Sequence, residues 1–202
     1  MENEAVFERA TEALKHDHRV IEKVLAVLER LTESSVGASL ETWRKAIDFI
    51  RNFADKCHHL KEEKIFFPAL EERGIPREGG PIGMMLTEHE EGRGYVRLMA
   101  AALLLAEEDP KAAETSLLDN ARAYLRLLRQ HIRKEDEILF EMADEVLTQE
   151  DQNKLLREFE EHEAKEMEAG VHEKYLKIAE ELEETQIKAV NTSVYDKGHS
   201  HL

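Results

Sequence analysis

The fold of this chain is decided by the stretch Cys57-His58-His59-Leu60-Lys61-Glu62-Glu63-Lys64-Ile65-Phe66-Phe67-Pro68. It recurs in altered form as Gln130-His131-Ile132-Arg133-Lys134-Glu135-Asp136-Glu137-Ile138-Leu139-Phe140. Aligning the two copies places His58 over His131 and Glu62 over Glu135, so each copy is His-x-x-x-Glu followed by an apolar run. A spacing of four residues places an imidazole and a carboxylate one turn apart on the same side of a helix. Two such helices can offer four ligands to a metal pair inside a bundle.

The composition indicates a helix-rich protein with few turns. Hydrophobic residues make up 42% and charged residues 36% of the 202 residues, with nine Gly and four Pro. The net charge of −16 argues against nucleic acid or an anionic membrane surface as a partner. No apolar run approaches the ~18 residues of a membrane span, and the first twenty residues do not read as a signal peptide. The single cysteine, Cys57, reads as a core thiol and suits a reducing compartment, so we predict a cytoplasmic protein.

Four stretches with apolar residues at helical spacing predict four long helices. They cover residues 5–31, 40–72, 82–106 and 110–147. The segments between them are short and carry the Gly, Pro and Ser residues of turns. Four helices of similar length with short connections predict an all-α, up-down-up-down four-helix bundle over residues 1–147.

Each predicted helix carries one histidine on its inner stripe, at a position that would otherwise be apolar. The four histidines are His18, His58, His89 and His131, and the second and fourth stripes also contain Glu62 and Glu135. A single inward histidine is more often a hydrogen-bonded core residue than a ligand. An inward carboxylate, however, is rarely buried without a partner. Six nitrogen and oxygen ligands without a thiolate fit a pair of iron ions, with manganese or zinc as lesser options.

Several neighbours of these positions are assigned by the same periodicity. At ~100° per residue, His59 and Glu63 fall outside the inner face of the second helix, so we predict that neither is a ligand. Arg93 either hydrogen-bonds a carboxylate near the site or extends to solvent at the bundle edge. Tyr124 is expected to fill the core, with a hydroxyl close to the ligands as the alternative. Ile138 is expected to be one of the apolar side chains that limit solvent at the site.

After the fourth helix the chain becomes strongly acidic. Residues 148–190 are predicted to form an additional C-terminal helix whose apolar side, from Phe159 to Leu182, packs on the bundle or on a partner subunit in a homodimer. A third His-x-x-x-Glu, His162–Glu166, lies off that side and is predicted to be solvated. His172 adjoins the apolar side. Residues 191–202 are expected to be a disordered tail.

The four histidine segments resemble those of the hemerythrin-like (HHE cation-binding) domains. The resemblance covers about Thr11 to Val146 and rests on Lys15-His16-Asp17-His18-Arg19, His58–Pro68, Thr87-Glu88-His89-Glu90-Glu91-Gly92-Arg93 and His131–Phe140. It implies a non-haem di-iron centre, commonly oxo- or hydroxo-bridged, in which Glu62 and Glu135 span both irons. The metal ligands that it implies are His18, His58, Glu62, His89, His131 and Glu135.

The chain departs from the oxygen-carrying hemerythrins in its ligands. Those proteins have a second histidine four residues from the third-helix histidine, where this chain has Met85 and Arg93. They typically use Asp at a spacing of five in the fourth helix, where this chain has Glu135 at a spacing of four. Both differences argue against simple reversible oxygen carriage. The vacancy is filled by water, by a substrate or by a C-terminal residue, for which His172 is the candidate.

Two functions remain open from the sequence. The first is a di-iron protein that binds or turns over a small oxidant, which is dioxygen, peroxide or nitric oxide. The alternative is an iron- or oxygen-sensing module that signals through its C-terminal helix. A structural bundle with accidental histidines is disfavoured, because it would bury two carboxylates and four imidazoles without a cation. The sequence does not separate binding from turnover.

Overall fold

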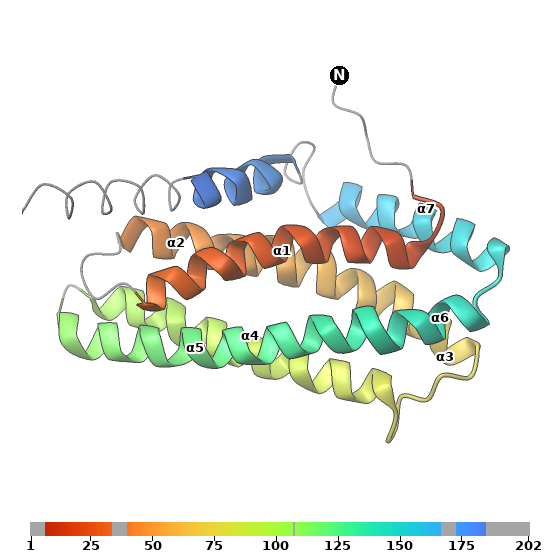
Figure 1. Ribbon diagram of the computed structural model, residues 1–202, viewed down its shortest axis with the longest axis horizontal. Helices are drawn as coiled ribbons and strands as arrows, with labels where there is room; N and C mark the ends of the chain where they lie inside the picture. Colours follow the sequence, from red (N-terminus) through yellow and green to blue (C-terminus); the bar gives the residue numbers. More distant parts are fainter. Residues whose placement is uncertain (1–6, 34–39, 107, 167–172, 185–202) are drawn as a thin grey trace, which may run out of the picture.

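Long helices run side by side as a bundle in the computed structural model, which describes residues 7–33, 40–106, 108–166 and 173–184 (Figure 1). The first run is α1 (Ala10–Glu33) and the third is α4 (Pro81–Leu105). The second run joins α2 (Leu40–Phe49), the π-helices η1 (Ile50–His59) and η2 (Glu62–Phe66), and α3 (Phe67–Glu72). The fourth joins α5 (Pro110–Lys134), the π-helix η3 (Glu135–Leu139) and α6 (Phe140–Val146). The predicted all-α four-helix bundle with a C-terminal helical extension is confirmed.

The helix ends follow local sequence signals. Pro81 and Pro110 stand in the first turns of α4 and α5, where a missing backbone N–H does no harm. Asp109 caps α5 by accepting a hydrogen bond of 3.0 Å from the backbone N–H of Ala112. After α3, Gly74 takes a φ of +88°, which a residue without a Cβ adopts readily at a helix C-terminus. These signals fix where the chain reverses.

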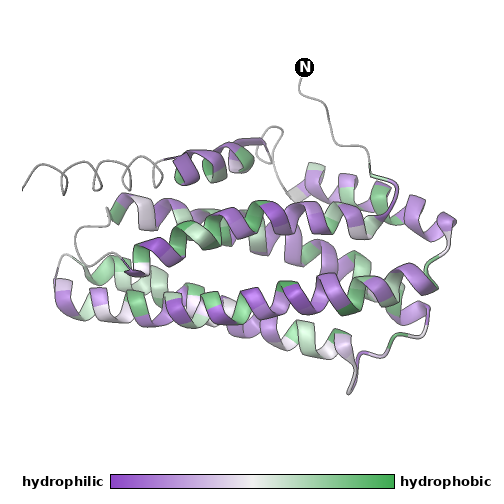
Figure 2. Cartoon of the chain, viewed as in Figure 1, coloured by the Kyte–Doolittle hydropathy of each residue, from purple (hydrophilic) through white to green (hydrophobic). Residues whose placement is uncertain are grey.

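The bundle has two apolar cores with a polar layer between them. Every described helix carries both hydrophilic and hydrophobic residues, as Figure 2 shows. One core includes Ile21 and Leu128, and the other includes Leu14 and Leu139. Because Leu14 and Ile21 lie in different cores on the same helix, the buried residue between them, His18, belongs to the intervening layer. The histidines of the other helices occupy the same level.

The π-helices shift the inner face of two helices by one residue. Ile138 was predicted to be an inner residue, but it is 54% exposed, whereas Leu139 is buried. In the second run, Phe66 is likewise buried in place of Ile65, which is only partly buried. The cause is that π-type hydrogen bonding from i to i+5 accommodates an additional residue in the turn. The prediction for Ile138 assumed uninterrupted α-helix and was wrong.

The two described segments after α6 both contact the bundle. The helix α7 (Gln149–Glu166) packs along α1 and beside η1 and η2, as Figure 1 shows for α1. The helical residues 173–184 lie against α2, where the Tyr175 hydroxyl donates a hydrogen bond of 3.0 Å to Asp48. His172 and residues 185–202, which include the predicted tail, lie outside the described residues.

His162 on α7 differs from its prediction. It was expected to be solvated, but it is buried, and its Nε2 lies 3.3 Å from the carbonyl oxygen of Lys56. The reason is that α7 packs directly on η1. In the part of the chain that the structure describes, no helix combines the length and the apolar character needed to cross a bilayer.

Candidate metal centre

Seven buried His and Glu side chains meet between the four helical runs. The first group consists of His18, His58, Glu62 and Glu135. The second consists of Glu62, His89, His131 and Glu135, and His59 forms a further group with His89 and His131. Within each group the ligand atoms lie within 4.8 Å of one another, which is close enough for one ion. All six ligands predicted within the described residues therefore come together, while His172 lies outside those residues.

The two glutamates connect the groups. The two carboxylate oxygens of Glu62 lie 3.5 Å from His58 Nε2 and 3.4 Å from His89 Nε2. Glu135 Oε2 lies 3.3 Å from both His18 Nε2 and His131 Nε2. Each carboxylate thus faces one histidine from each group. This is the arrangement in which a glutamate can bridge two metal ions.

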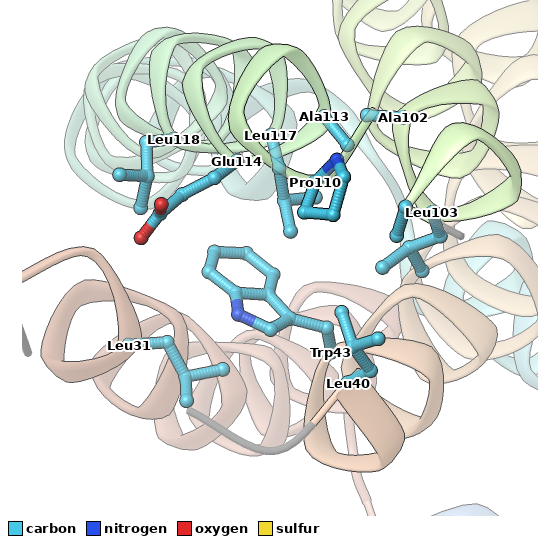
Figure 3. Close-up of a pocket in the computed structure, with 11 residues that line it drawn as sticks. Leu31, Leu40, Trp43, Ala102, Leu103, Pro110, Ala113, Glu114, Leu117 and Leu118 are labelled. Carbon is cyan, nitrogen blue, oxygen red and sulfur yellow. The ribbon is translucent and has the colours of Figure 1, made fainter. Parts of the chain in front are cut away.

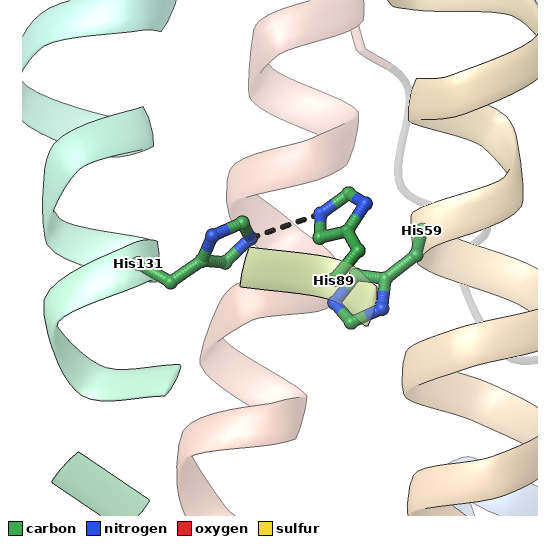
Figure 4. Close-up of side chains that lie close together, drawn as sticks. All are labelled: His59, His89 and His131. Atoms are coloured by element: carbon green, nitrogen blue, oxygen red, sulfur yellow. Dashed lines mark hydrogen bonds between the residues drawn. The ribbon is translucent and has the colours of Figure 1, made fainter. Parts of the chain in front are cut away.

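Three histidines crowd the second group, as Figure 4 shows. His89 Nε2 and His131 Nε2 are 3.1 Å apart. Two nitrogens held ~2.1 Å from one ion at a right angle would have about this separation. The ring of His59 stacks on the ring of His89 with centroids 4.0 Å apart, at an interplanar angle of 15°.

The prediction that His59 points outward was wrong. Its exposed fraction is only 6%, and it lies with His89 and His131 rather than on the outer face. His58 and His59 both belong to η1, and the wider π-helical turn brings two consecutive residues toward the centre. The doubled histidine was the signal in the sequence. Its interpretation required the π-helical phase, which the α-helical periodicity did not provide.

A carboxylate from outside the two groups faces the Nδ1 atom of each histidine. The distances from Nδ1 to the nearest carboxylate oxygen are 2.7 Å for His18–Asp136, 3.2 Å for His58–Asp17, 2.7 Å for His89–Glu63, 3.0 Å for His131–Glu88 and 3.7 Å for His59–Asp55. The four shorter contacts are hydrogen bonds, and they favour the tautomer with its proton on Nδ1. The lone pair on Nε2 is then available to a cation, as in carboxylate–histidine–metal sites.

Basic side chains hold these outer carboxylates in place. Arg93 donates to Glu63 at 2.6 Å and to Asp55 at 2.7 Å, which resolves its two predicted roles in favour of a carboxylate near the site. Lys61 is 1% exposed and donates to Asp17 at 2.7 Å. Arg19 pairs with Asp136, and Lys134 pairs with Glu88. Lys61 and Lys134 occupy the same position in the two copies of the repeat.

The centre repeats itself with approximate two-fold symmetry. Asp17-His18 on α1 corresponds to Glu88-His89 on α4. The repeated sequence His-x-x-Lys-Glu-acid makes equivalent contacts in both copies. Histidine Nδ1 and lysine Nζ meet the acid that precedes the histidine of one of these two helices, and the last acid of the repeat meets the histidine of the other helix. His59 breaks the symmetry, because Ile132 stands in its place in the other copy. One group therefore offers two imidazoles and the other offers three.

Electrostatics leave the centre short of positive charge. Burial raises the pKa of Glu62, and the negative charge of Glu135 raises it further. Burial also lowers the pKa of His58, to about 3, despite the nearby Asp17. His18 and His131 differ, because burial is outweighed by the carboxylates that face them: Asp136 and Glu135 raise the pKa of His18, and Glu135 and Glu88 raise that of His131 to about 9. Without a cation, the two facing carboxylates cannot both remain ionised.

The buried polar atoms that lack a hydrogen-bond partner indicate which kind of ligand the centre fits. Both oxygens of Glu62, both oxygens of Glu135 and the Nε2 atoms of His18 and His58 are buried without a hydrogen bond among the described residues. Such groups are normally paired, and a pair of metal ions would satisfy all six atoms. The donors are imidazole nitrogens and carboxylate oxygens, which suit iron and related divalent metals. The residues therefore fit a pair of metal ions.

The apolar pocket in Figure 3 belongs to another part of the molecule. It has a volume of about 220 Å³ and is lined by residues such as Leu31, Trp43 and Leu117. Leu31 is 13 residues beyond His18 on α1, or about 20 Å at 1.5 Å per residue. The pocket therefore contributes nothing to the His–Glu groups.

Comparison with known proteins agrees with this geometry. Residues 9–143 match the family model described as the hemerythrin HHE cation binding domain. The chain is similar to "Uncharacterized protein Rv1995" of Mycobacterium tuberculosis and "Uncharacterized protein Mb2018" of Mycobacterium bovis, with 27% identity over 176 residues in each case. These alignments cover 85% of this chain and 68% of each relative. No solved structure matches the chain significantly.

Proposed function

The chain belongs to the hemerythrin HHE cation-binding family, and on that premise we propose that it holds two non-haem iron ions and binds a small oxidant at them. The observation that carries this proposal is the position of Glu62 and Glu135, each of which faces histidine nitrogens of both groups at 3.3 to 3.5 Å. His18 and His58 complete the ligands of one ion. His59, His89 and His131 complete those of the other.

The donor set supports iron over other metals. It is made of imidazoles and carboxylates, whereas a structural zinc site would use thiolates, and calcium or magnesium would use more oxygen. Cys57 is buried in the core, where burial raises the pKa of its thiol to about 12, and it belongs to neither group. Manganese and zinc are the lesser options, as expected from the sequence.

One of the two groups has room for an external ligand and lies beside aromatic side chains that limit water. The group around His18 and His58 supplies one imidazole fewer than the other, so it has more room for an external ligand. Phe140 stacks against His18 with ring centroids 5.5 Å apart, and Phe66 is fully buried beside Phe140. These rings limit the access of water, which suits a small ligand such as dioxygen, peroxide or nitric oxide. Bound iron would supply the reversible transfer of electrons to that ligand.

Metal analysis of the freshly purified protein tests the proposal. We expect about two irons per chain, and Glu135→Ala should abolish their uptake because Glu135 serves both groups. His59→Ala should now remove iron from the three-histidine group, in contrast to the prediction from sequence. His16→Ala is the matched control, because His16 is exposed on the same helix as His18. A purified protein that contains no iron, or a His59→Ala variant with a full complement of iron, would contradict the assignment.

Stopped-flow spectroscopy distinguishes binding from turnover. A long-lived oxygenated species that is released under vacuum would indicate carriage. Rapid loss of added peroxide, with the iron centre unchanged afterwards, would indicate an enzyme. Neither outcome alters the ligand assignment, which the metal content of the variants tests.

A sensor function is the second candidate, and a specific chain of contacts favours it. His58 meets Asp17, Asp17 accepts from Lys61, and Lys61 also donates to Glu163 of α7 at 2.6 Å. The corresponding contacts of the other copy end at Lys134, whose side chain is 30% exposed. Among the described residues, this chain of contacts therefore links one side of the centre to the C-terminal extension. A change in metal occupancy at His58 would be transmitted to α7 through this link.

Hydrogen exchange tests the sensor hypothesis. If it is correct, residues 149–166 exchange faster in the metal-free protein than in the iron-loaded protein. The comparison should be repeated in Lys61→Met, where the link is removed and the metal-dependent difference should shrink. Equal protection of α7 in both metal states of the unmodified protein would exclude signalling through this helix.

A further inference from the structure

A second pocket opens on the bundle surface between η1 and α4 and reaches the candidate metal centre. Its volume is about 200 Å³. Its inner part is lined by His59, Ile50, Val96 and Tyr124, of which none is more than 8% exposed. At ~30 Å³ per water molecule this space would hold about six or seven waters. It is smaller than the ~300 Å³ typical of the lower limit for drug-sized ligands, so it suits a ligand of a few atoms.

Tyr124 gives the pocket an unsatisfied hydrogen-bonding group. Its side chain is 1% exposed, and its hydroxyl is buried without a hydrogen-bond partner among the described residues. Buried hydroxyl groups are normally paired, so this one calls for a ligand or a water. Gly92 has no side chain to cover the tyrosine ring, and even an added Cβ would approach it only to 3.6 Å. The expectation that Tyr124 simply fills the core leaves its hydroxyl unexplained.

The mouth of the pocket is basic in an otherwise acidic protein. Arg51, Lys56 and Arg97 line it and are exposed, although the chain carries a net charge of −16. Within the described parts of the chain, neither Arg51 nor Arg97 forms an ion pair with a carboxylate. The only acid in the lining, Asp55, is already bonded to Arg93. The uncompensated charge at the mouth therefore favours an anion.

We propose that this pocket binds a short-chain carboxylate. Arg51 and Arg97 supply the positive charge, and the Tyr124 hydroxyl donates a hydrogen bond to a carboxylate oxygen. The apolar side chains of Ile50 and Val96 receive the alkyl part, which distinguishes a carboxylate from a fully hydrated inorganic anion. The ligand lies beside His59, at the edge of the three-histidine group. The proposal goes beyond the binding of an oxidant and does not require that iron is present.

Calorimetric titration of the protein as isolated tests the proposal, with acetate and propionate as probes and phosphate as the comparison. We expect saturable binding of both carboxylates and much weaker binding of phosphate. Arg97→Gln should weaken propionate binding about tenfold, because a charge-assisted contact is lost. Tyr124→Phe removes only the hydroxyl and should weaken it about three- to tenfold. Arg126→Gln is the matched control, since it removes the same charge from an exposed site outside the pocket, and should leave affinity within about twofold.

The alternative outcomes are each decisive. Absence of carboxylate binding, or phosphate binding as tight as that of propionate, would overturn the proposal. Equal affinity in the Arg97→Gln, Tyr124→Phe and unmodified proteins, together with a changed visible spectrum, would place the carboxylate on the metal and also overturn it. Iron content is measured separately on the same samples. If the protein contains no iron but still binds propionate through Tyr124, the absence of iron refutes the di-iron proposal and the carboxylate proposal stands.

Discussion

Replacing Lys61 by methionine tests whether the contacts between the outer carboxylates and the basic side chains stabilise the folded protein, in addition to orienting the histidines. The Lys61 side chain is 2% exposed and lies between Asp17, which is 4% exposed, and Glu163, which is 29% exposed. Burial would raise the pKa of Asp17, but Lys61 and His58 outweigh it and hold that pKa below its ordinary range. Methionine is unbranched, is only one atom shorter than lysine, and carries no charge. Asp17 would then be a buried carboxylate without a cation.

The expected loss follows from the difference in burial between the two lysines of the repeat. Breaking a buried ion pair by removing one partner destabilises a protein by about 3–5 kcal/mol. Glu163 adds little to this figure, because it can turn to solvent. Lys134 makes the equivalent contact with Glu88, but it is 30% exposed, so Lys134→Met should lose no more than about 1 kcal/mol. For a chain of this size, 3–5 kcal/mol corresponds to a decrease in Tm of about 6–20 °C.

Thermal and urea unfolding of the metal-free proteins provide the assay, because bound metal would obscure a two-state transition. Asp17→Asn combined with Lys61→Met should recover part of the lost stability, since no uncompensated charge remains at Asp17. Equal free energies of unfolding for the Lys61→Met and Lys134→Met variants would refute the reasoning. So would a double variant that is less stable than Lys61→Met alone.

Three further predictions follow from the structure. Glu63→Gln should weaken iron affinity about 10- to 100-fold, because Glu63 orients His89. The control Glu137→Gln, whose carboxylate pairs with Arg133 outside the centre, should leave the affinity unchanged. Both affinities are measured by competition titration with a chelator. Leu139→Ala should lower the free energy of unfolding, measured by urea denaturation, by about 2–5 kcal/mol. Ile138→Ala should change it by less than about 0.5 kcal/mol, because Ile138 is exposed. A larger loss in Ile138→Ala than in Leu139→Ala would contradict the π-helical phase. Burial and a nearby aspartate raise the pKa of Tyr175 to about 12. The Tyr175 hydroxyl therefore stabilises the folded protein below its unfolded pKa of about 10, and this stabilisation is lost between about pH 10 and 12. In an absorbance titration, Tyr175→Phe should lack the last ionisation step of the unmodified protein.

The sequence was sufficient for the fold because its apolar periodicity is strong and long. The second helical run was predicted from residue 40 to 72, which is where the structure places it. The α-helical period nevertheless failed at the site itself, since η1, η2 and η3 follow a wider turn there. Ile138 and His59 were both misplaced for this reason. A rule based on 3.6 residues per turn cannot predict where a helix departs from that geometry.

The outer contacts of the centre could not be predicted, because they join residues that are distant in the sequence. Lys61 and Glu163 are 102 positions apart, and Lys61 and Asp17 are 44 positions apart. Periodicity places a residue on one face of its own helix, but it does not define which residue of another helix will face it. A buried lysine is unusual enough that its partners had to be acidic, yet their identity required the packing of α1 and α7. The inner His and Glu residues could be predicted because each lies on the apolar face of its own helix. Their outer partners could not, because those contacts depend on how different helices pack together.

The single break in the repeat determines how the two halves of the centre differ. In one copy the residue after the inward histidine is His59, and in the other it is Ile132, which is 3% exposed within an apolar core. An alkyl side chain cannot bind a metal, so one half of the centre has a hydrocarbon side chain where the other has a potential ligand. The halves are otherwise matched down to the lysine and the two acids. A fully symmetric repeat with six histidines would offer the same ligands to both ions of the proposed centre. Under that proposal, this one difference would leave one half with three imidazoles and the other with two and more room for an external ligand.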